Sequence, residues 1–196
     1  MNDYQLILAS GSPRRRELLE RVGLRFTVAP ADVDETLVPG LSPREQVMRL
    51  SRIKAEAAAR SAPEGSVILT ADTVVVLEDA ILGKPKDPAD ARRMLKALSG
   101  RHHHVLTGVT VRSGERTETH CEETEVYLRP LSDGEIDAYI ATGEPMDKAG
   151  AYGIQGYASL FVEKLSGDYY NVMGLPLCAA ALMLRRAGIP VLEGRP

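Results

Sequence analysis

Residues 67–77 read Val-Ile-Leu-Thr-Ala-Asp-Thr-Val-Val-Val-Leu, and this most apolar stretch of the chain carries one carboxylate, Asp72, at its middle. The apolar and β-branched residues predict strand over 66–71 and over 73–78. An ionised carboxylate inside an apolar strand must be paired, hydrogen-bonded or metal-bound. The alternative is a tight turn over residues 71–73 that exposes Asp72, because aspartate is common in turns. Both interpretations make Asp72 a functional candidate, since ligands bind at strand ends in open α/β sheets.

Strand-like and helix-like segments alternate on both sides of this stretch, which is typical of an α/β protein. Further strands are expected over residues 5–9, 25–29, 102–111, 117–128 and 160–165. Helices are expected over residues 13–22, 43–59, 88–98, 133–141 and 175–187, and a loop over 166–171. The segments on either side of Ser113-Gly114 are expected to pair antiparallel, which makes the predicted sheet mixed.

Length and composition narrow the class of protein. A chain of 196 residues favours one domain over 1–196. The net charge of −3 argues against a general nucleic-acid binder. Cys121 and Cys178 lack metal-ligand spacing and predict free thiols in the cytoplasm. Neither secretion nor membrane insertion is expected, because the first residues lack a basic region and the apolar runs are short.

The segment after the first expected strand carries cations where a helix disfavours them. Ser12 suits the N-cap and Pro13 the first helical position. Arg14, Arg15 and Arg16 then fill the first turn, although the helix dipole favours acidic side chains there by roughly 0.3–1 kcal/mol per charge. An anion at this N-terminus would remove the conflict, because arginines and N–H groups would bind phosphate oxygens together. The alternative is three solvated arginines.

Three further charged side chains are candidates for binding an anion or a metal. Lys54 shares a helical arc with the core candidates Val47, Leu50, Ile53 and Ala57. Its ammonium either extends to the edge of the core or reaches an anionic pocket. Lys84 lies on a constrained segment between Gly83 and Pro85, and a surface loop lysine is the alternative. Glu35 belongs to an acidic run that could offer hard oxygen ligands to Mg²⁺ or Mn²⁺, or could be solvated.

A glycine-rich segment and a histidine run complete the candidates. Gly150, Gly153 and Gly156 would let the backbone approach a ligand closely, with a loop that only turns as the alternative. Gln155 can both donate and accept hydrogen bonds, which suits the edge of a nucleobase. The run 102–104 is interpreted as a surface strand and not as a metal site, because only two of its three histidines share a face.

Taken together, these segments resemble the Maf family of nucleoside triphosphate pyrophosphatases, within the inosine-triphosphate-pyrophosphatase-like superfamily. The resemblance runs from Leu6 to about Ala187 and is carried by the motifs Leu8–Arg15, Asp34–Glu35, Lys54–Ala55, Ala71–Thr73, Gly83–Pro85, Asp147–Gly156 and Gly174–Leu177. It implies an α/β fold with a twisted mixed sheet in two lobes, helices on its faces and a cleft between the lobes. It also implies a cytoplasmic, metal-dependent hydrolase that cuts between the α and β phosphates.

The resemblance further implies a substrate and a set of roles. Arg14, Thr73 and Gln155 match the subgroup that acts on dTTP and UTP, and Asp72 matches the proton acceptor. Substrate contacts are then expected from Ser10, Arg14, Arg15, Glu35, Lys54, Thr73, Lys84 and Gln155. Glu35 and Asp72 are expected to hold Mg²⁺ or Mn²⁺.

The sequence therefore yields the hypothesis of a dTTP and UTP pyrophosphatase that releases the monophosphate and pyrophosphate. No nucleic-acid or membrane partner is expected, and a homodimer would be unsurprising. One alternative is an enzyme that clears modified pyrimidine nucleotides. Another is a nucleotide-binding regulator of cell division and septum formation whose hydrolysis is incidental, and a third is nucleotidyl transfer to a sugar.

Overall fold

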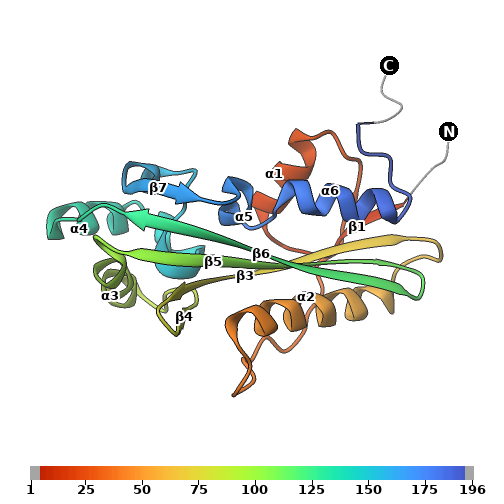
Figure 1. The fold of residues 1–196 in the computed structure, drawn as a ribbon, viewed down its shortest axis with the longest axis horizontal. Coiled ribbons are helices and arrows are strands. Elements are labelled where there is room, and N and C mark those ends of the chain that lie inside the picture. Colours follow the sequence, from red (N-terminus) through yellow and green to blue (C-terminus); the bar gives the residue numbers. More distant parts are fainter. Residues whose placement is uncertain (1–4, 193–196) are drawn as a thin grey trace. The chain divides into compact units, whose positions relative to one another are not determined.

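The computed structural model describes residues 5–192, in which strands and helices alternate as an α/β fold (Figure 1). The strands are β1 (Leu6–Leu8), β2 (Thr27–Val28), β3 (Val67–Leu77), β4 (Ala80–Leu82), β5 (His102–Ser113), β6 (Arg116–Leu128) and β7 (Val162–Ser166). The α-helices are α1 (Pro13–Arg21), α2 (Pro43–Ala59), α3 (Pro88–Leu98), α4 (Asp133–Ala141), α5 (Tyr169–Met173) and α6 (Leu177–Arg186). Three short 3-10 helices are η1 (Glu144–Asp147), η2 (Ala149–Ala151) and η3 (Tyr157–Leu160). The predicted α/β class is confirmed.

The strands form a mixed sheet, as predicted. Its order is β2-β1-β3-β5-β6-β7, and β4 pairs with β3 outside this path. β1 runs parallel to both β2 and β3, with Leu8 opposite Leu69, whereas the β3–β4 and β6–β7 pairs are antiparallel. β5 and β6 are joined by a two-residue turn that begins at Gly114, whose positive φ of 59° suits glycine.

Contacts divide the chain into two compact units. Within the described residues, unit 1 comprises 5–72, 107–122 and 174–192, and unit 2 comprises 73–106 and 123–173. The long strands β3, β5 and β6 each contribute residues to both units. That the two units make one domain stays a prediction. No helix among residues 5–192 has the length and hydropathy that a membrane span requires.

β3 is one uninterrupted strand, so the alternative of a turn at residues 71–73 is wrong. Its first part pairs with β1 and its last part with β4, which keeps the backbone extended through Asp72. Asp72 is only 9% exposed. Side chains alternate between the faces of a strand, so Thr70 and Asp72 share one face, and Thr73 and Val75 share the other.

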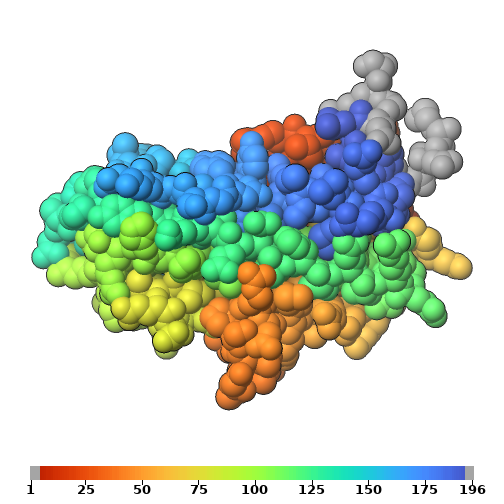
Figure 2. Space-filling view, in the orientation of Figure 1, coloured from red at the N-terminus to blue at the C-terminus, as the bar shows by residue number. Residues whose placement is uncertain are grey.

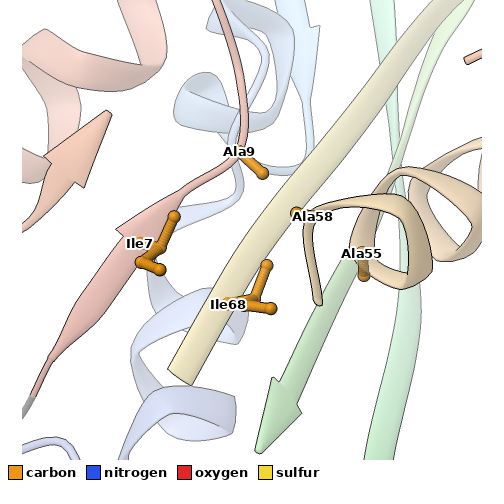
Figure 3. Close-up of a cluster of buried hydrophobic side chains, with 5 residues drawn as sticks. All are labelled: Ile7, Ala9, Ala55, Ala58 and Ile68. Atoms are coloured by element: carbon orange, nitrogen blue, oxygen red, sulfur yellow. The ribbon is translucent and has the colours of Figure 1, made fainter. Parts of the chain in front are cut away.

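α2 begins and ends where the sequence predicts, because Ser42 and Glu45 form a complete capping box at its N-terminus. Its buried face is rotated from the predicted arc, because Ile53 and Ala57 are only half-buried. The buried residues of the helix are Gln46, Val47, Leu50, Ser51, Lys54, Ala55 and Ala58. Small side chains on this face allow close packing against strands. A cluster of Ala55 and Ala58 with Ile7, Ala9 and Ile68 joins α2 to β1 and β3 (Figure 3).

A buried polar layer sets the position of α2 against β3 and β5. The Thr70 hydroxyl donates to the carbonyl of Ser51 at 2.6 Å, and the hydroxyls of Ser51 and Thr110 lie 2.9 Å apart. Gly108 of β5 lies directly against α2, since a Cβ there would collide with the backbone of Val47 and Met48. The close contact between the β5 backbone and α2 and the hydrogen bonds of the buried hydroxyls therefore both fix the position of this helix.

In unit 2, α3 packs against α4, and the side chains of the two helices form part of the surface in Figure 2. Several short elements of this unit differ from the prediction, and η1, η2 and η3 lie where no helix was expected. β4 was not predicted, and the predicted loop over 166–171 runs into the helix α5. Asn171 explains the helix: it is buried and its amide donates to the Val105 carbonyl and the Thr124 hydroxyl.

We expect Gly108→Ala to destabilise the protein by about 1–3 kcal/mol, because the added methyl would push α2 away from β5. Gly134→Ala in α4 is the matched control, since a Cβ there meets no atom within 4 Å. Urea unfolding of both variants measures the effect. Equal stability of the Gly108 variant and wild type would contradict the close approach.

Candidate functional site

The parallel register of β1 and β3 brings the end of β1 beside Asp72. Leu8 pairs with Leu69, and the Ala9 N–H donates to the Leu69 carbonyl at 2.9 Å. Two residues further along each strand, the chain reaches Ser10 and Ala71, the neighbour of Asp72. Distant residues thus meet at the carboxyl end of β1, the usual ligand side of a parallel pair.

Lys54 reaches an anionic pocket made by the protein itself. Its Nζ lies 2.7 Å from Asp72 Oδ1 and 2.7 Å from Glu35 Oε1. The two carboxylates differ in exposure, because the Asp72 side chain is 12% exposed and the Glu35 side chain 61%. Since desolvation weakens solvent screening, the pair with Asp72 is the stronger of the two. Of the two alternatives for Lys54, the ammonium lies between carboxylates and does not extend to the edge of the core, while its role in substrate binding stays a prediction.

Arg15 connects this ion pair to the end of β1. Its Nη1 donates to the Ser10 hydroxyl at 3.0 Å and its Nε to the Gly174 carbonyl at 2.8 Å. Burial lowers the pKa of Arg15, and the nearby Asp72 and Glu35 carboxylates oppose that shift while Arg14 adds to it. Arg15 therefore lies within electrostatic range of both carboxylates. Unit 1 brings together six of the predicted residues: Ser10, Arg14, Arg15, Glu35, Lys54 and Asp72.

The N-terminus of α1 has the features that the sequence predicts. Ser12 is the N-cap and Pro13 follows it, but the Ser12 side chain makes no capping hydrogen bond. No acidic residue lies in the first turn. The positive helix end and the Arg14 and Arg15 side chains thus share the first turn of α1, and Arg15 lies within electrostatic range of Asp72 and Glu35. This arrangement can attract an anion such as a phosphate.

The remaining three predicted residues, Thr73, Lys84 and Gln155, belong to unit 2. Thr73 is half-buried in β3, and Lys84 and Gln155 are exposed. The segments that carry these two residues are linked, because the Gly150 N–H donates to the Gly83 carbonyl at 3.0 Å. The roles of all three residues in substrate binding stay predictions.

The glycine-rich segment 149–156 needs its glycines for close packing as well as for turning. Gly150 has a φ of 67°, and a Cβ there would lie 2.9 Å from the Val75 side chain. Cβ atoms at residues 153 and 156 would collide with Lys148 and Glu144. These glycines approach side chains of the protein itself, which the sequence did not indicate.

Tyr152 anchors the same segment to β5. Its hydroxyl lies 2.7 Å from Nε2 of His103, and the two rings meet edge to face with centroids 5.3 Å apart. Burial raises the pKa of Tyr152 and lowers the pKa of His103 to about 4, so both groups are neutral at pH 7. His102 and His104 lie on the other face, near Glu125 and Glu123.

Glu35 and Asp72 fit a divalent cation in their chemistry, since both are carboxylates that face one positive charge. One oxygen of each carboxylate lies 2.7 Å from the same ammonium nitrogen. Mg²⁺ is commonly held by one or two carboxylates together with substrate phosphates and water. Among residues 5–192 no group of three or more histidine, cysteine or acidic side chains is arranged to hold a metal ion. The two carboxylates would therefore supply only part of a coordination sphere.

Sequence reasoning missed several residues that support this site. Ser51 and Thr70 position α2, and the carbonyl of Gly174, a motif residue for which no contact was expected, holds Arg15. No local pattern marks these contacts, since each joins residues that are far apart in the chain. The glycine spacing did mark segment 149–156, but not the side chains that it packs against.

Comparisons with known proteins place these features in a family context. The Maf-like protein family model matches residues 5–187. A dTTP/UTP pyrophosphatase of Anaeromyxobacter dehalogenans (strain 2CP-C) is 54% identical over 191 residues, which cover 95% of this chain and 96% of that protein. A dTTP/UTP pyrophosphatase of Symbiobacterium thermophilum is 53% identical over 190 residues, with 97% of each chain covered.

A solved structure shares the fold at low sequence identity. The Staphylococcus aureus Ham1 protein superposes with a TM-score of 0.53 at 14% identity. The match covers 92% of this chain and 99% of the Ham1 chain. This likeness concerns the fold alone.

The depressed pKa of His103 predicts an acid-dependent loss of stability. In the unfolded chain histidine titrates near 6.5, roughly 2.5 pKa units above the native value. Between these pH values His103 binds a proton in the unfolded chain but not in the native protein. The free energy of unfolding therefore falls as the pH falls, by about 3 kcal/mol at most. Glutamine does not titrate, so we expect the stability of His103→Gln to depend less on pH than that of wild type. The wild-type protein should lose more stability than the variant between about pH 7 and pH 5, so the difference in the free energy of unfolding between the two should shrink.

Urea unfolding across this pH range makes the measurement. Tyr152→Phe is the control, because it removes the hydrogen bond to His103 and leaves the buried imidazole in place. Its curve is expected to run parallel to that of wild type. Parallel curves for wild type and His103→Gln would contradict the prediction.

Proposed function

The chain belongs to the Maf-like protein family, and on this premise we propose that it is a nucleoside triphosphate pyrophosphatase acting on dTTP and UTP. It would hydrolyse the bond between the α and β phosphates and release the monophosphate and pyrophosphate. The observation that carries the proposal is identity above 50% over nearly the whole chain to proteins named for this activity. The charged cluster of unit 1 supplies groups that suit the chemistry.

The phosphates would bind the cations of the site. In unit 1, Arg14, Arg15 and Lys54 outnumber the carboxylates Glu35 and Asp72 by one positive charge, and Lys84 is assigned to the phosphates as well. Arginine forks and the α1 N-terminus suit phosphate oxygens through charge-assisted hydrogen bonds. The Ser10 hydroxyl, which Arg15 already contacts, is assigned to the same oxygens. Phosphoryl chemistry depends mainly on such positioning and charge stabilisation.

Glu35 and Asp72 would hold a divalent cation, Mg²⁺ or Mn²⁺. When bound, such an ion neutralises phosphate charge and polarises the bond to be cut. Binding would require both carboxylates to share or give up their contacts with the Lys54 ammonium. Lys54, which lies beside both carboxylates, would contact the phosphates as a further cation.

Asp72 would also act as the general base for the attacking water. Its hydrogen bond with Lys54 uses Oδ1, and an ionised carboxylate has further lone pairs that can accept a proton. The strand β3 holds this side chain in place from both directions along the chain. A rigidly held base is what in-line attack by water requires.

Thr73 and Gln155 would recognise the pyrimidine. A hydroxyl and an amide can match the carbonyl and N–H groups that uracil and thymine share, whereas cytosine differs at its 4-position. A base that leaves such polar groups unpaired is strongly disfavoured. We also place the enzyme in the cytoplasm, which suits its two free thiols, and a homodimer stays a prediction.

A panel of nucleoside triphosphates assayed for pyrophosphate tests the function. We expect release from dTTP and UTP in the presence of Mg²⁺ or Mn²⁺, with CTP and the purine nucleotides much slower and little turnover in EDTA. Tight nucleotide binding without pyrophosphate release would instead favour the regulatory alternative. Faster turnover of modified pyrimidines than of dTTP and UTP would change the assigned substrate.

Asp72→Asn in the same assay separates catalysis from binding. We expect kcat to fall by roughly 10²–10⁴-fold at saturating Mn²⁺, since the amide cannot accept the proton, while nucleotide still binds. Asp79→Asn, on the exposed turn after β3, is the matched control and should leave kcat unchanged. Pyrophosphate release at the wild-type rate by the Asp72 variant would remove the base role.

A further inference from the structure

Glu144 lies at the start of η1, and the glycine-rich segment wraps around its carboxylate. The Tyr139 hydroxyl donates to Oε1 at 2.8 Å, and the Tyr157 N–H donates to Oε2 at 3.0 Å. The carboxylate is half-buried, and both of its oxygens are used in holding other groups. None of the roles assigned above uses this residue.

The hydrogen bonds of Glu144 continue into the segment itself. The Tyr139 oxygen that donates to Glu144 also accepts the Gly153 N–H at 3.1 Å. A chain of contacts therefore runs from the Gly153 amide through Tyr139 and Glu144 to the Tyr157 amide. Gln155 lies midway between the two amides that this chain fixes.

Steric contacts keep the same backbone close to Glu144. A Cβ at residue 156 would collide with the Glu144 carboxylate, and a Cβ at residue 153 would lie 2.5 Å from Cε of Lys148. Lys148 in turn donates to the Glu144 carbonyl at 2.7 Å and to Asp147 at 2.6 Å. The backbone at residues 153 and 156 therefore lies directly against these two side chains, which would have to move to admit a larger residue.

The direction of the hydrogen bonds is set by the protonation of the phenol. Burial and the bond to Glu144 raise the pKa of Tyr139, which keeps the hydroxyl protonated as a donor. Tyr139 is 3% exposed and packs edge to face on Phe161, with centroids 5.3 Å apart. It thus provides a fixed point to which Glu144 is attached.

We propose that Glu144 is a positioning residue for base selection, which holds the backbone on both sides of Gln155 so that its amide meets the pyrimidine in one orientation. The inference rests on the proposed function. Gln155 is exposed, so without this support its amide would sample several orientations and discriminate poorly between bases. Glu144 itself would contact no reacting atom.

The test compares Glu144→Ala and Glu144→Gln with the control Glu163→Ala, an exposed carboxylate on β7 of the same unit. One readout is amide hydrogen exchange at residues 153 and 157, which needs no substrate. The other is the kinetics of UTP and CTP hydrolysis by the full chain with Mn²⁺. Glutamine keeps one acceptor oxygen and should partly rescue both readouts.

For Glu144→Ala we expect faster exchange of both amides, a KM for UTP raised by about tenfold and a kcat within about threefold of wild type. The preference for UTP over CTP in kcat/KM should fall by about tenfold. Glu163→Ala should match wild type in every readout.

Faster exchange with unchanged KM and unchanged preference would overturn the proposal, because Glu144 would then be structural only. Unchanged exchange in a folded Glu144→Ala variant would overturn it as well. If the wild-type protein hydrolyses no pyrimidine triphosphate, the proposed function fails and base selection by Glu144 fails with it. The exchange data still show separately whether Glu144 orders the segment.

Discussion

The ion pair between Lys54 and Asp72 is the contact on which the rest of the site depends. An ammonium and a carboxylate that are both largely withdrawn from water must be paired, since each alone would be costly to bury. Lys54 also contacts the more exposed Glu35, and Arg15 lies within electrostatic range of both acids. These four groups balance in charge, and Arg14 beside Arg15 adds one positive charge that suits an anionic ligand.

The fold creates this pairing through two independent alignments. Parallel pairing of β1 with β3 brings Ser10, and with it Arg15, to the level of Asp72. The hydrogen bond from Thr70 of β3 to the Ser51 carbonyl of α2 fixes the register of the helix against the strand. Lys54 lies one turn after Ser51 and Asp72 lies two residues after Thr70, so this register brings Lys54 and Asp72 together. Backbone contact at Gly108 allows α2 to lie close enough for both bonds. Stability and site geometry thus share the same residues.

Local signals explain what could be predicted and what could not. The predicted bounds of α2, α3 and α4 are accurate, and in the structure Ser42, Asp87 and Ser132 each cap the helix that follows. The turn alternative at Asp72 failed because strand pairing on both sides outweighs the local preference of aspartate. The partner of Lys54 could not be predicted, since it depends on the register of a helix against a strand. The role of Thr73 rested on family resemblance alone, whereas Lys84 and Gln155 were also candidates from their own chemistry and position in the sequence.

A double-mutant cycle on the ion pair tests the central claim most directly. The free energies of unfolding of wild type, Lys54→Met, Asp72→Asn and the double variant are measured in urea at pH 7. If each group is buried because the other neutralises it, the double variant should lose less stability than the two single variants lose in sum. The coupling energy, which is the difference between that sum and the loss in the double variant, should exceed about 1 kcal/mol. Additive effects would contradict the account.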